Sequence, residues 1–493
     1  MLFTSWQFLL VFLPATLLGF AVLQRYGSNE LCVVWLLAAS CVFYGYWSIP
    51  YFWLLAGAMT VNFILGRLID EARGKTRRIL FGLAVAANLA LLCYYKYVDF
   101  FISAFADLTG VRVPLLQVFL PLGISFFTFQ KIAYISDIHV GKAKSRRFLD
   151  FALFVFFFPQ LIAGPIVHHA EVMPQFRRLA APAHVEADTR WTNYAVGFAL
   201  LAIGLVKKVV VADNIAPFVE PAFATARVGD VGAALAWQGA LCYGVQLYFD
   251  FSGYSDMAIG LARLFGVRLP ANFDKPYASV TIVEFWRRWH MTLSRFLRDY
   301  VYIPLGGNRN GETRRAINLL ATMVLGGFWH GANYTFIIWG GLHGFYLLVA
   351  HAWTRHGPWR LPAFVSRILT LVFVLVAWAP FRADSAGEAG VMMAGMIGLK
   401  GLRLDQIGFS PGGFAAGVAL LIACVVLPSA RQILRAYHPT LGAPAPAPEY
   451  APALFARPAF TWPSLAWAAF LAAGIVAVEL FSWQTSEFLF FRF

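Results

Sequence analysis

The sequence has few charged residues and no cysteine spacing typical of a disulfide framework or a zinc site. Charged residues make up 13% of its 493 residues, and hydrophobic residues make up 60%. That composition excludes an ordinary soluble domain and indicates a polytopic membrane protein. The five cysteines all lie in apolar stretches without a Cys-x-x-Cys pair, so we interpret them as small buried hydrophobic residues.

Long charge-free stretches recur along the chain, and basic residues form three loops, 67–78, 142–147 and 287–315. The stretches predict an all-α fold with about eleven to thirteen transmembrane helices. No basic residue precedes Arg25, so we expect the first helix to be retained rather than cleaved as a signal peptide. The net charge of +14 is better explained by cytoplasmic basic loops than by nucleic-acid binding. Placing loops 67–78 and 142–147 in the cytoplasm puts the N-terminus outside.

Composition changes once along the chain, which divides it into three parts. Residues 1–438 alternate apolar spans with short loops and form the expected membrane core. Residues 439–461 are rich in proline and alanine, which favours an extended linker. Residues 462–493 hold a final span and an aromatic tail. The tail is either an interfacial anchor or a plug inserted into a cavity of the protein.

The stretch 316–353 contains no charged residue but holds His330 and His343. An ionisable residue at membrane depth usually faces the protein interior and a functional path. Gly327 and Gly331 flank His330 and allow close approach of neighbouring backbones, and Asn333 follows. A neutral imidazole can accept and return a proton, so His330 is the first candidate for catalysis. For His343 we favour a packing role.

Residues 281–304 combine arginines with apolar residues at helical spacing, which predicts one amphipathic helix. His290 lies at the edge between the two faces. The arginines could bind the phosphates of a nucleotide-bearing donor, or they could anchor the protein on anionic lipid. The residues expected at this phosphate site are Trp286, Arg287, Arg288, Arg295 and Arg298.

Three further features each allow a structural and a functional interpretation. Asp250 and Asp256 could form a proton path, pair with arginine or cap a helix beginning near Ser255, and we favour structural pairing. The prolines in 158–166 interrupt a membrane helix, as happens where a helix lines a cavity or is buried. The pair His168-His169 is interpreted as a loop feature, because no third metal ligand of suitable spacing is apparent. We therefore predict no metal site.

Six segments in order resemble the membrane-bound O-acyltransferase superfamily, specifically its bacterial alginate O-acetyltransferase branch. They are 121–130, 159–165, 249–256, 284–290, 302–309 and 329–331. The resemblance runs over nearly the whole chain. It implies a ring of helices around a central catalytic pore in the bacterial inner membrane, with a cytoplasmic funnel and an outer opening. It also implies that His330 matches the family's essential histidine and His290 its second histidine.

The resemblance further implies acyl transfer from a cytoplasmic donor, acetyl-CoA, toward an extracytoplasmic polysaccharide such as alginate. No tightly bound cofactor is implied. A separate periplasmic or membrane-anchored acetyltransferase partner completes transfer in related systems, so the polysaccharide is reached indirectly. His330 would deprotonate a hydroxyl, and His290 or Asn333 would stabilise the oxyanion or orient His330. Related tails carry a tyrosine fourth from the end, where this chain has Phe490, so an acyl-tyrosine relay is not expected.

Two rival functions remain open at this stage. Broken helices with polar residues at membrane depth also suit a proton-coupled transporter or flippase of an exopolysaccharide export system. We see no inverted repeat, and the arginine-rich segment suits a phosphate-bearing donor better. A non-catalytic scaffold of a secretion complex is the third reading, and it predicts that His330 is dispensable.

Overall fold

The computed structural model describes residues 1–111, 113–144, 147–179, 187–357 and 359–442, and near the C-terminus 471–474, 476, 478 and 489. The described residues between 1 and 438 are mostly helical. Most of the predicted linker and final span lie outside the described residues. Within the last span, residues 471–474, 476 and 478 are helical.

All regular elements of the described residues are helices. Those of the first half are α1 (Leu13–Tyr26), α2 (Asn29–Gly45), α3 (Ile49–Glu71), α4 (Gly74–Leu92), α5 (Val98–Thr109), α6 (Ile124–His139), α7 (Phe148–Phe156), α8 (Phe158–Leu161), α9 (His169–Phe176), α10 (Ala187–Leu205), α11 (Asp213–Ile215) and α12 (Glu220–Arg227). Those of the second half are α13 (Ala233–Leu264), α14 (Ile282–Arg288), α15 (Met291–Leu297), α16 (Gly311–His330), α17 (Tyr334–His356), α18 (Ala363–Arg382), α19 (Ala386–Met396), α20 (Pro411–Val426) and α21 (Ala430–Ile433).

Short π-helical and 3₁₀ segments extend or join these helices. The π-helical segments are η1 (Gln7–Phe12), η2 (Cys93–Tyr97), η3 (Val206–Ala212) and η6 (Arg298–Tyr302). The 3₁₀ segments are η4 (Ala216–Phe218), η5 (Pro276–Ala278) and η7 (Arg435–Tyr437). The interruption predicted within 158–166 is present, because α7 ends at Phe156 and α8 is a single short turn.

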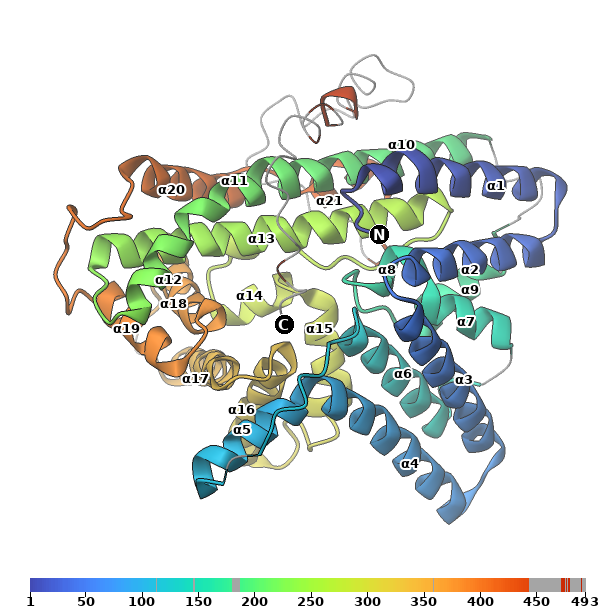
Figure 1. Cartoon of the computed structure of the whole chain (residues 1–493), viewed down its shortest axis with the longest axis horizontal. Coiled ribbons are helices and arrows are strands. Elements are labelled where there is room, and N and C mark those ends of the chain that lie inside the picture. The colour runs from blue at the N-terminus through green and yellow to red at the C-terminus, as the bar shows by residue number, and fades with distance from the viewer. Residues whose placement is uncertain are drawn as a thin grey trace.

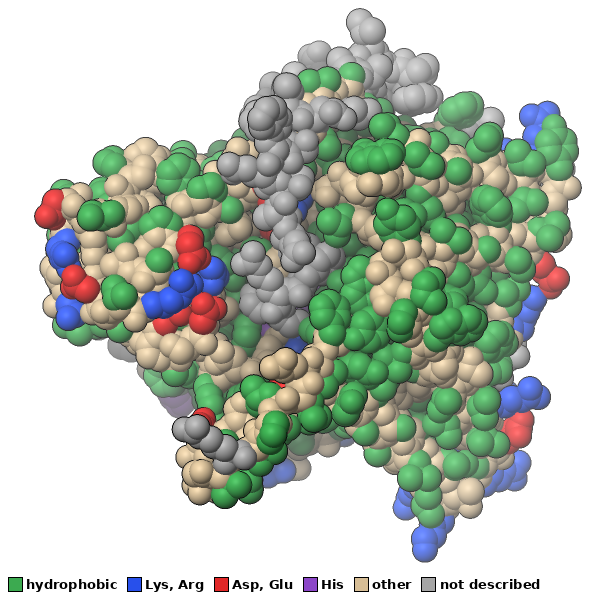
Figure 2. Space-filling model, viewed as in Figure 1, with side chains coloured by type: hydrophobic (Ala, Val, Ile, Leu, Met, Phe, Trp, Pro, Cys, Tyr) green, Lys and Arg blue, Asp and Glu red, His purple; other side chains and the backbone are tan. Residues whose placement is uncertain are grey.

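Seven helices of the described residues are long and apolar enough to cross a membrane. Figure 1 shows α10 and α13 lying lengthwise side by side, α3, α4 and α6 fanning away from them, and α14 and α15 near the centre. On the face in Figure 2 hydrophobic side chains cover much of the surface, and charged ones gather toward its margins. Such an apolar exterior suits contact with lipid.

The basic loops meet on one side of the molecule, as the positive-inside reading predicts. The Arg77 guanidinium at the start of α4 donates to the carbonyl oxygen of Ile138 at the end of α6. Arg147 pairs with Glu30, at the start of α2, at 2.7 Å. We call this side of the protein the basic side. The helix α4 begins on this side and leads through η2 to Lys96, which contacts the end of α16 on the opposite side.

Glycines let the two longest helix pairs approach closely. A Cβ on Gly327 of α16 would lie 2.2 Å from the carbonyl oxygen of Phe336, and one on Gly340 of α17 would lie 2.4 Å from that of Met323. A Cβ on Gly204 of α10 would lie 2.5 Å from the carbonyl oxygen of Gly253 of α13. No side chain fits at these crossings, which confirms that small residues near His330 allow close helix packing.

The two aspartates of α13, buried Asp250 and partly buried Asp256, are paired with lysines of η3. Lys208 Nζ lies 2.7 Å from Asp250 and 2.8 Å from Asp213, and Lys207 Nζ lies 2.6 Å from Asp256. The favoured structural pairing is therefore confirmed, although the partners are lysines rather than arginines. The alternative of a helix beginning near Ser255 is wrong, because α13 is continuous through that residue. The interpretation of all cysteines as buried is also wrong for Cys93, which is exposed.

Candidate active site

His330 is the last residue of α16 and is buried among aromatic rings. Its ring centroid lies 5.2 Å from those of Trp339 and Phe381 and 6.5 Å from that of His290. The helix ends here because Gly331 adopts an extended conformation and Asn333 starts the next helix. The imidazole is thus held at a helix end within a tightly packed helical hairpin.

Side chains from η2 cap the end of the helix that carries His330. The last carbonyls of an α-helix have no partner within the helix. Lys96 Nζ donates to the carbonyl oxygens of Trp329 at 2.6 Å and His330 at 2.9 Å. The Tyr97 hydroxyl donates to the carbonyl oxygen of Phe328 at 3.0 Å. Our sequence reasoning missed both residues, although Lys96 stands out as the charge that ends the apolar stretch 79–95.

A pocket of about 420 Å³ lies beside His330 on the side opposite the basic loops. Gly331 and Asn333, which follow His330, form part of its wall, and Lys96 lies in the same wall. Its remaining lining residues are Tyr95, Val98, Asp99, Val118, Leu120, Ala332, Phe336, Phe381, Arg382, Ala383, Asp384 and Leu489. A ligand entering this pocket would therefore approach the His330 end of α16.

Asn333 lines the pocket, and its amide group makes two hydrogen bonds. Its Oδ1 accepts from the backbone N–H of Thr335 at 3.1 Å, which makes it the N-cap of α17. Its Nδ2 donates to the carbonyl oxygen of Asp384 at 2.8 Å. Nδ2 carries a second hydrogen, so these two bonds leave one donor over, and the oxyanion role of Asn333 stays a prediction.

His290 is buried where the predicted amphipathic helix breaks. A single helix over 281–304 is wrong: α14 ends at Arg288, His290 has a φ of 42°, and α15 begins at Met291. His290 Nδ1 lies 3.0 Å from Asn272 Oδ1, which can only accept, so Nδ1 carries the proton. The other nitrogen, Nε2, is buried and has no hydrogen-bond partner among the described residues. The lone pair of Nε2 is therefore available to accept a hydrogen bond inside the protein.

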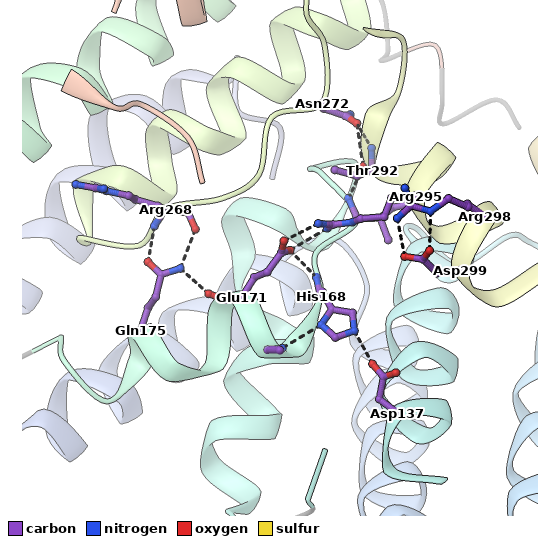
Figure 3. A network of polar contacts seen from close by, with 12 residues as sticks. Asp137, His168, Glu171, Gln175, Arg268, Asn272, Thr292, Arg295, Arg298 and Asp299 are labelled. Atoms are coloured by element: carbon purple, nitrogen blue, oxygen red, sulfur yellow. Dashed lines mark hydrogen bonds and ion pairs between the residues drawn. The ribbon is translucent and has the colours of Figure 1, made fainter. Parts of the chain in front are cut away.

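The predicted phosphate-binding residues do not form one free cluster. Arg288 pairs with Glu284, Arg298 with Asp299, and Arg295 with Glu171 through two contacts of 2.5 and 2.8 Å. Figure 3 shows the Arg295 guanidinium facing the Glu171 carboxylate. These carboxylates already satisfy three of the four arginines, so free anion-binding capacity there is small.

The fourth arginine of this set, Arg287, is exposed, and the described residues show no ion pair for it. It lies close enough to His351 of α17 for its charge to act on that ring, as does Arg315 of α16. Trp286 lies in the aromatic core instead, 5.1 Å from the His343 ring and 5.8 Å from that of Trp339. His343 is buried in the same cluster, as its predicted packing role requires.

One residue of the aromatic tail is described, and it is buried inside the protein. The backbone N–H of Leu489 donates to Asp250 Oδ2 at 3.0 Å, and its side chain lines the pocket beside His330. At Leu489 the structure therefore favours the plug over the interfacial anchor. Phe490 lies outside the described residues.

Comparison with known proteins defines the class. The model of the MBOAT, membrane-bound O-acyltransferase, family matches residues 142–378. The peptidoglycan O-acetyltransferase of Helicobacter pylori is 42% identical over 440 residues, covering 83% of this chain and 82% of the relative. The probable alginate O-acetylase of Pseudomonas aeruginosa is 40% identical over 420 residues, covering 83% and 77%. That of Azotobacter vinelandii is 39% identical over 436 residues, covering 87% and 84%.

This chain belongs to the membrane-bound O-acyltransferase family. It is a multi-pass membrane enzyme of the O-acyltransferase class, as the resemblance of its sequence segments implied. The transporter and scaffold alternatives are set aside by this membership.

Proposed function

We propose that the protein transfers an acetyl group from cytoplasmic acetyl-CoA to an extracytoplasmic acceptor, for O-acetylation of a cell-surface polysaccharide, in the bacterial inner membrane. The observation that carries the proposal is the position of His330. Gly331, which follows it directly, forms part of the wall of the pocket on the side opposite the basic loops, and the His330 ring lies 6.5 Å from that of the buried His290. The three relatives compared above are named for O-acetylation.

The donor would enter from the basic side. Arg287 is exposed without an ion pair among the described residues, whereas Arg315, whose charge also acts on His351, pairs with Glu312 at 2.7 Å. Guanidinium groups without a carboxylate partner suit phosphate oxygens, which they bind through two parallel hydrogen bonds. We therefore assign donor phosphates to Arg287 rather than to Arg288, Arg295 or Arg298.

The acceptor would enter from the opposite side through the pocket. A hydroxyl placed there would give its proton to the His330 imidazole while its oxygen attacks the thioester carbonyl. When the tetrahedral intermediate collapses, the carbon–sulfur bond breaks and the imidazolium returns the proton to the thiolate. Burial of both histidines keeps water from the thioester. A polysaccharide chain would reach this pocket indirectly, through a periplasmic or membrane-anchored acetyltransferase partner.

The test uses purified protein with labelled acetyl-CoA, following label transfer and release of free CoA. We expect His330→Ala and His330→Gln to abolish turnover at normal expression, whereas His356→Gln, an exposed histidine at the end of α17, leaves it unchanged. Turnover equal to wild type in both His330 variants would refute the mechanism. Binding of labelled acetyl-CoA, compared between wild type and Arg287→Gln, tests the donor separately. Undiminished binding in Arg287→Gln refutes the assigned phosphate site.

A further inference from the structure

Two histidines and an aspartate from separate elements converge on the basic side of the protein. Asp137 belongs to α6, and His168 and His169 lie at the start of α9. One ligand atom from each lies within 4.8 Å of the other two. His168 Nε2 contacts Asp137 Oδ2, and Figure 3 shows the two side chains pointing toward each other. The Tyr300 hydroxyl of η6 donates to Asp137 Oδ2 at 2.9 Å and lies 3.0 Å from His168 Nε2.

The cluster contains a buried ligand atom without a hydrogen-bond partner. The side chain of His169 is 9% exposed, and its Nδ1 has no hydrogen bond among the described residues. That atom lies 3.6 Å from Asp137 Oδ2. A buried polar atom left without a partner destabilises a fold by about 1–3 kcal/mol, so such atoms call for an explanation.

The charge of Asp137 gives the second argument. Its carboxylate is buried, and within the described part of the chain its ion-pair partners are the two histidines, without a lysine or arginine. These histidines cancel its charge only when they are protonated, and buried charges are normally paired or bound to metal. The nearest carboxylate on α9, that of Glu171, is already neutralised by Arg295.

Two imidazole nitrogens and one carboxylate oxygen form a donor set typical of divalent transition metals. Zinc bonds of about 2.0–2.2 Å separate the ligands of a tetrahedral site by roughly 3.3 Å. The 3.6 Å between His169 and Asp137 is close to that value. For an ion to fit, His168 Nε2 must move away from Asp137 Oδ2 and lose the proton that the two atoms share. Its Nδ1 can then carry the ring proton, because the bond it accepts from Ala170 is a long one of 3.3 Å.

We propose that Asp137, His168 and His169 bind one divalent transition-metal ion of the zinc class, with the Tyr300 hydroxyl or water as the fourth ligand. The ion would join α6, α9 and η6. Because α9 also carries Glu171, the partner of Arg295, the ion would also brace α15, the helix that follows His290. No third ligand of suitable spacing was apparent in the sequence, because Asp137 lies 31 residues upstream of His168 on another helix.

The test is metal binding by the full-length purified protein after removal of bound metal with a chelator. We expect about one equivalent of Zn²⁺ per chain by elemental analysis, visible Co²⁺ absorption bands of a low-symmetry site, and a melting temperature raised by Zn²⁺. His169→Gln removes a ligand without removing a hydrogen bond. Its Zn²⁺ affinity should fall by more than the roughly 10–100-fold that loss of a residue hydrogen-bonded to a ligand produces.

The matched control is His356→Gln, which removes an exposed histidine outside the cluster and should bind as wild type does. Asp137→Asn should also lose the ion, but the conclusion does not depend on it if that variant folds poorly. Less than one equivalent in wild type, or a stoichiometry and affinity unchanged in His169→Gln, would overturn the proposal. The readout is metal content, so it is independent of acyl transfer.

Discussion

The cap on α16 by Lys96 predicts that a residue from a distant helix controls the placement of His330. The ammonium group bonds two carbonyls, at 2.6 and 2.9 Å, one of them that of His330 itself. Hydrogen bonds to a charged group contribute about 1.5–3 kcal/mol each, so the two together stabilise this helix end by about 3 kcal/mol or more. The Lys96→Met variant keeps the length of the side chain and loses both bonds.

A free helix end lets the imidazole drift from its working position. If about half of the lost 3 kcal/mol raises the free energy of the transition state, turnover drops roughly tenfold. A displacement of the imidazole by about 1 Å would lower turnover roughly 100-fold. We expect kcat to fall by 10- to 100-fold in Lys96→Met while binding of labelled donor is unchanged. Tyr97→Phe removes a single neutral hydrogen bond of about 1 kcal/mol, so its effect should be several-fold smaller.

The assay is CoA release by purified variants, together with donor binding and a thermal melt. Lys96→Arg serves as the charge-retaining variant, and it should recover part of the lost turnover. Turnover of Lys96→Met within twofold of wild type would refute the positioning role. Equal losses of turnover in Lys96→Met and Tyr97→Phe would also refute it, because the argument rests on the charged cap being stronger.

Three further outcomes are expected. Asn272→Leu removes the acceptor that fixes the His290 tautomer. Turnover should fall about 10- to 100-fold, equivalent to roughly 1–3 kcal/mol, while donor binding is retained. Turnover equal to that of wild type would contradict this. Lys208→Met leaves buried aspartates unpaired, and thermal melts should show a loss of about 3–5 kcal/mol. The Arg403 guanidinium holds the pKa of Asp230 below its usual 3.8, so the pair stabilises the protein above that pH and less as pH falls through the lowered pKa. Asp230→Asn should therefore lower the melting temperature slightly at pH 7 and not at the lowest pH; a pH-independent difference contradicts this.

The sequence predicted features that depend on local composition. Charge-free runs predicted the spans, and the basic loops predicted one side of the protein. On that side Arg77, at the start of α4, contacts Ile138, at the end of α6. The glycines around His330 predicted close helix crossing, and Gly327 and Gly340 form that crossing. In each case the physical requirement, either desolvation or lack of a Cβ, acts on the residue itself, so a single chain is enough to read it.

Contacts between distant segments could not be predicted in this way. The partner of Lys96 is a set of backbone carbonyls 233 and 234 residues away, and a carbonyl has no sequence signature. Asp137 reaches the histidine pair only because α6 and α9 fold together. The arginines were correctly located near His290, but their carboxylate partners depend on rotamers and tertiary packing, which amphipathic spacing does not encode.

The break at His290 gives a final prediction that separates backbone conformation from chemistry. A φ of 42° is left-handed, a conformation that destabilises most residues by about 1–2 kcal/mol and leaves glycine nearly unaffected. His290→Gly and His290→Ala lose the same imidazole and the same packing against the Phe251 ring. The difference between them therefore reports the backbone alone.

If His290 is left-handed, the glycine variant is the more stable of the two, by roughly 1 kcal/mol. If the helix were continuous through 281–304, as its apolar spacing predicted, alanine would be the more stable by about the same amount. Thermal melts of both variants thus decide between the two backbones by the sign of the difference. We expect both to lose turnover, because neither has the Nε2 lone pair that the break aims into the protein interior. Full activity in the glycine variant would mean that the strained backbone at His290 serves packing and not the reaction.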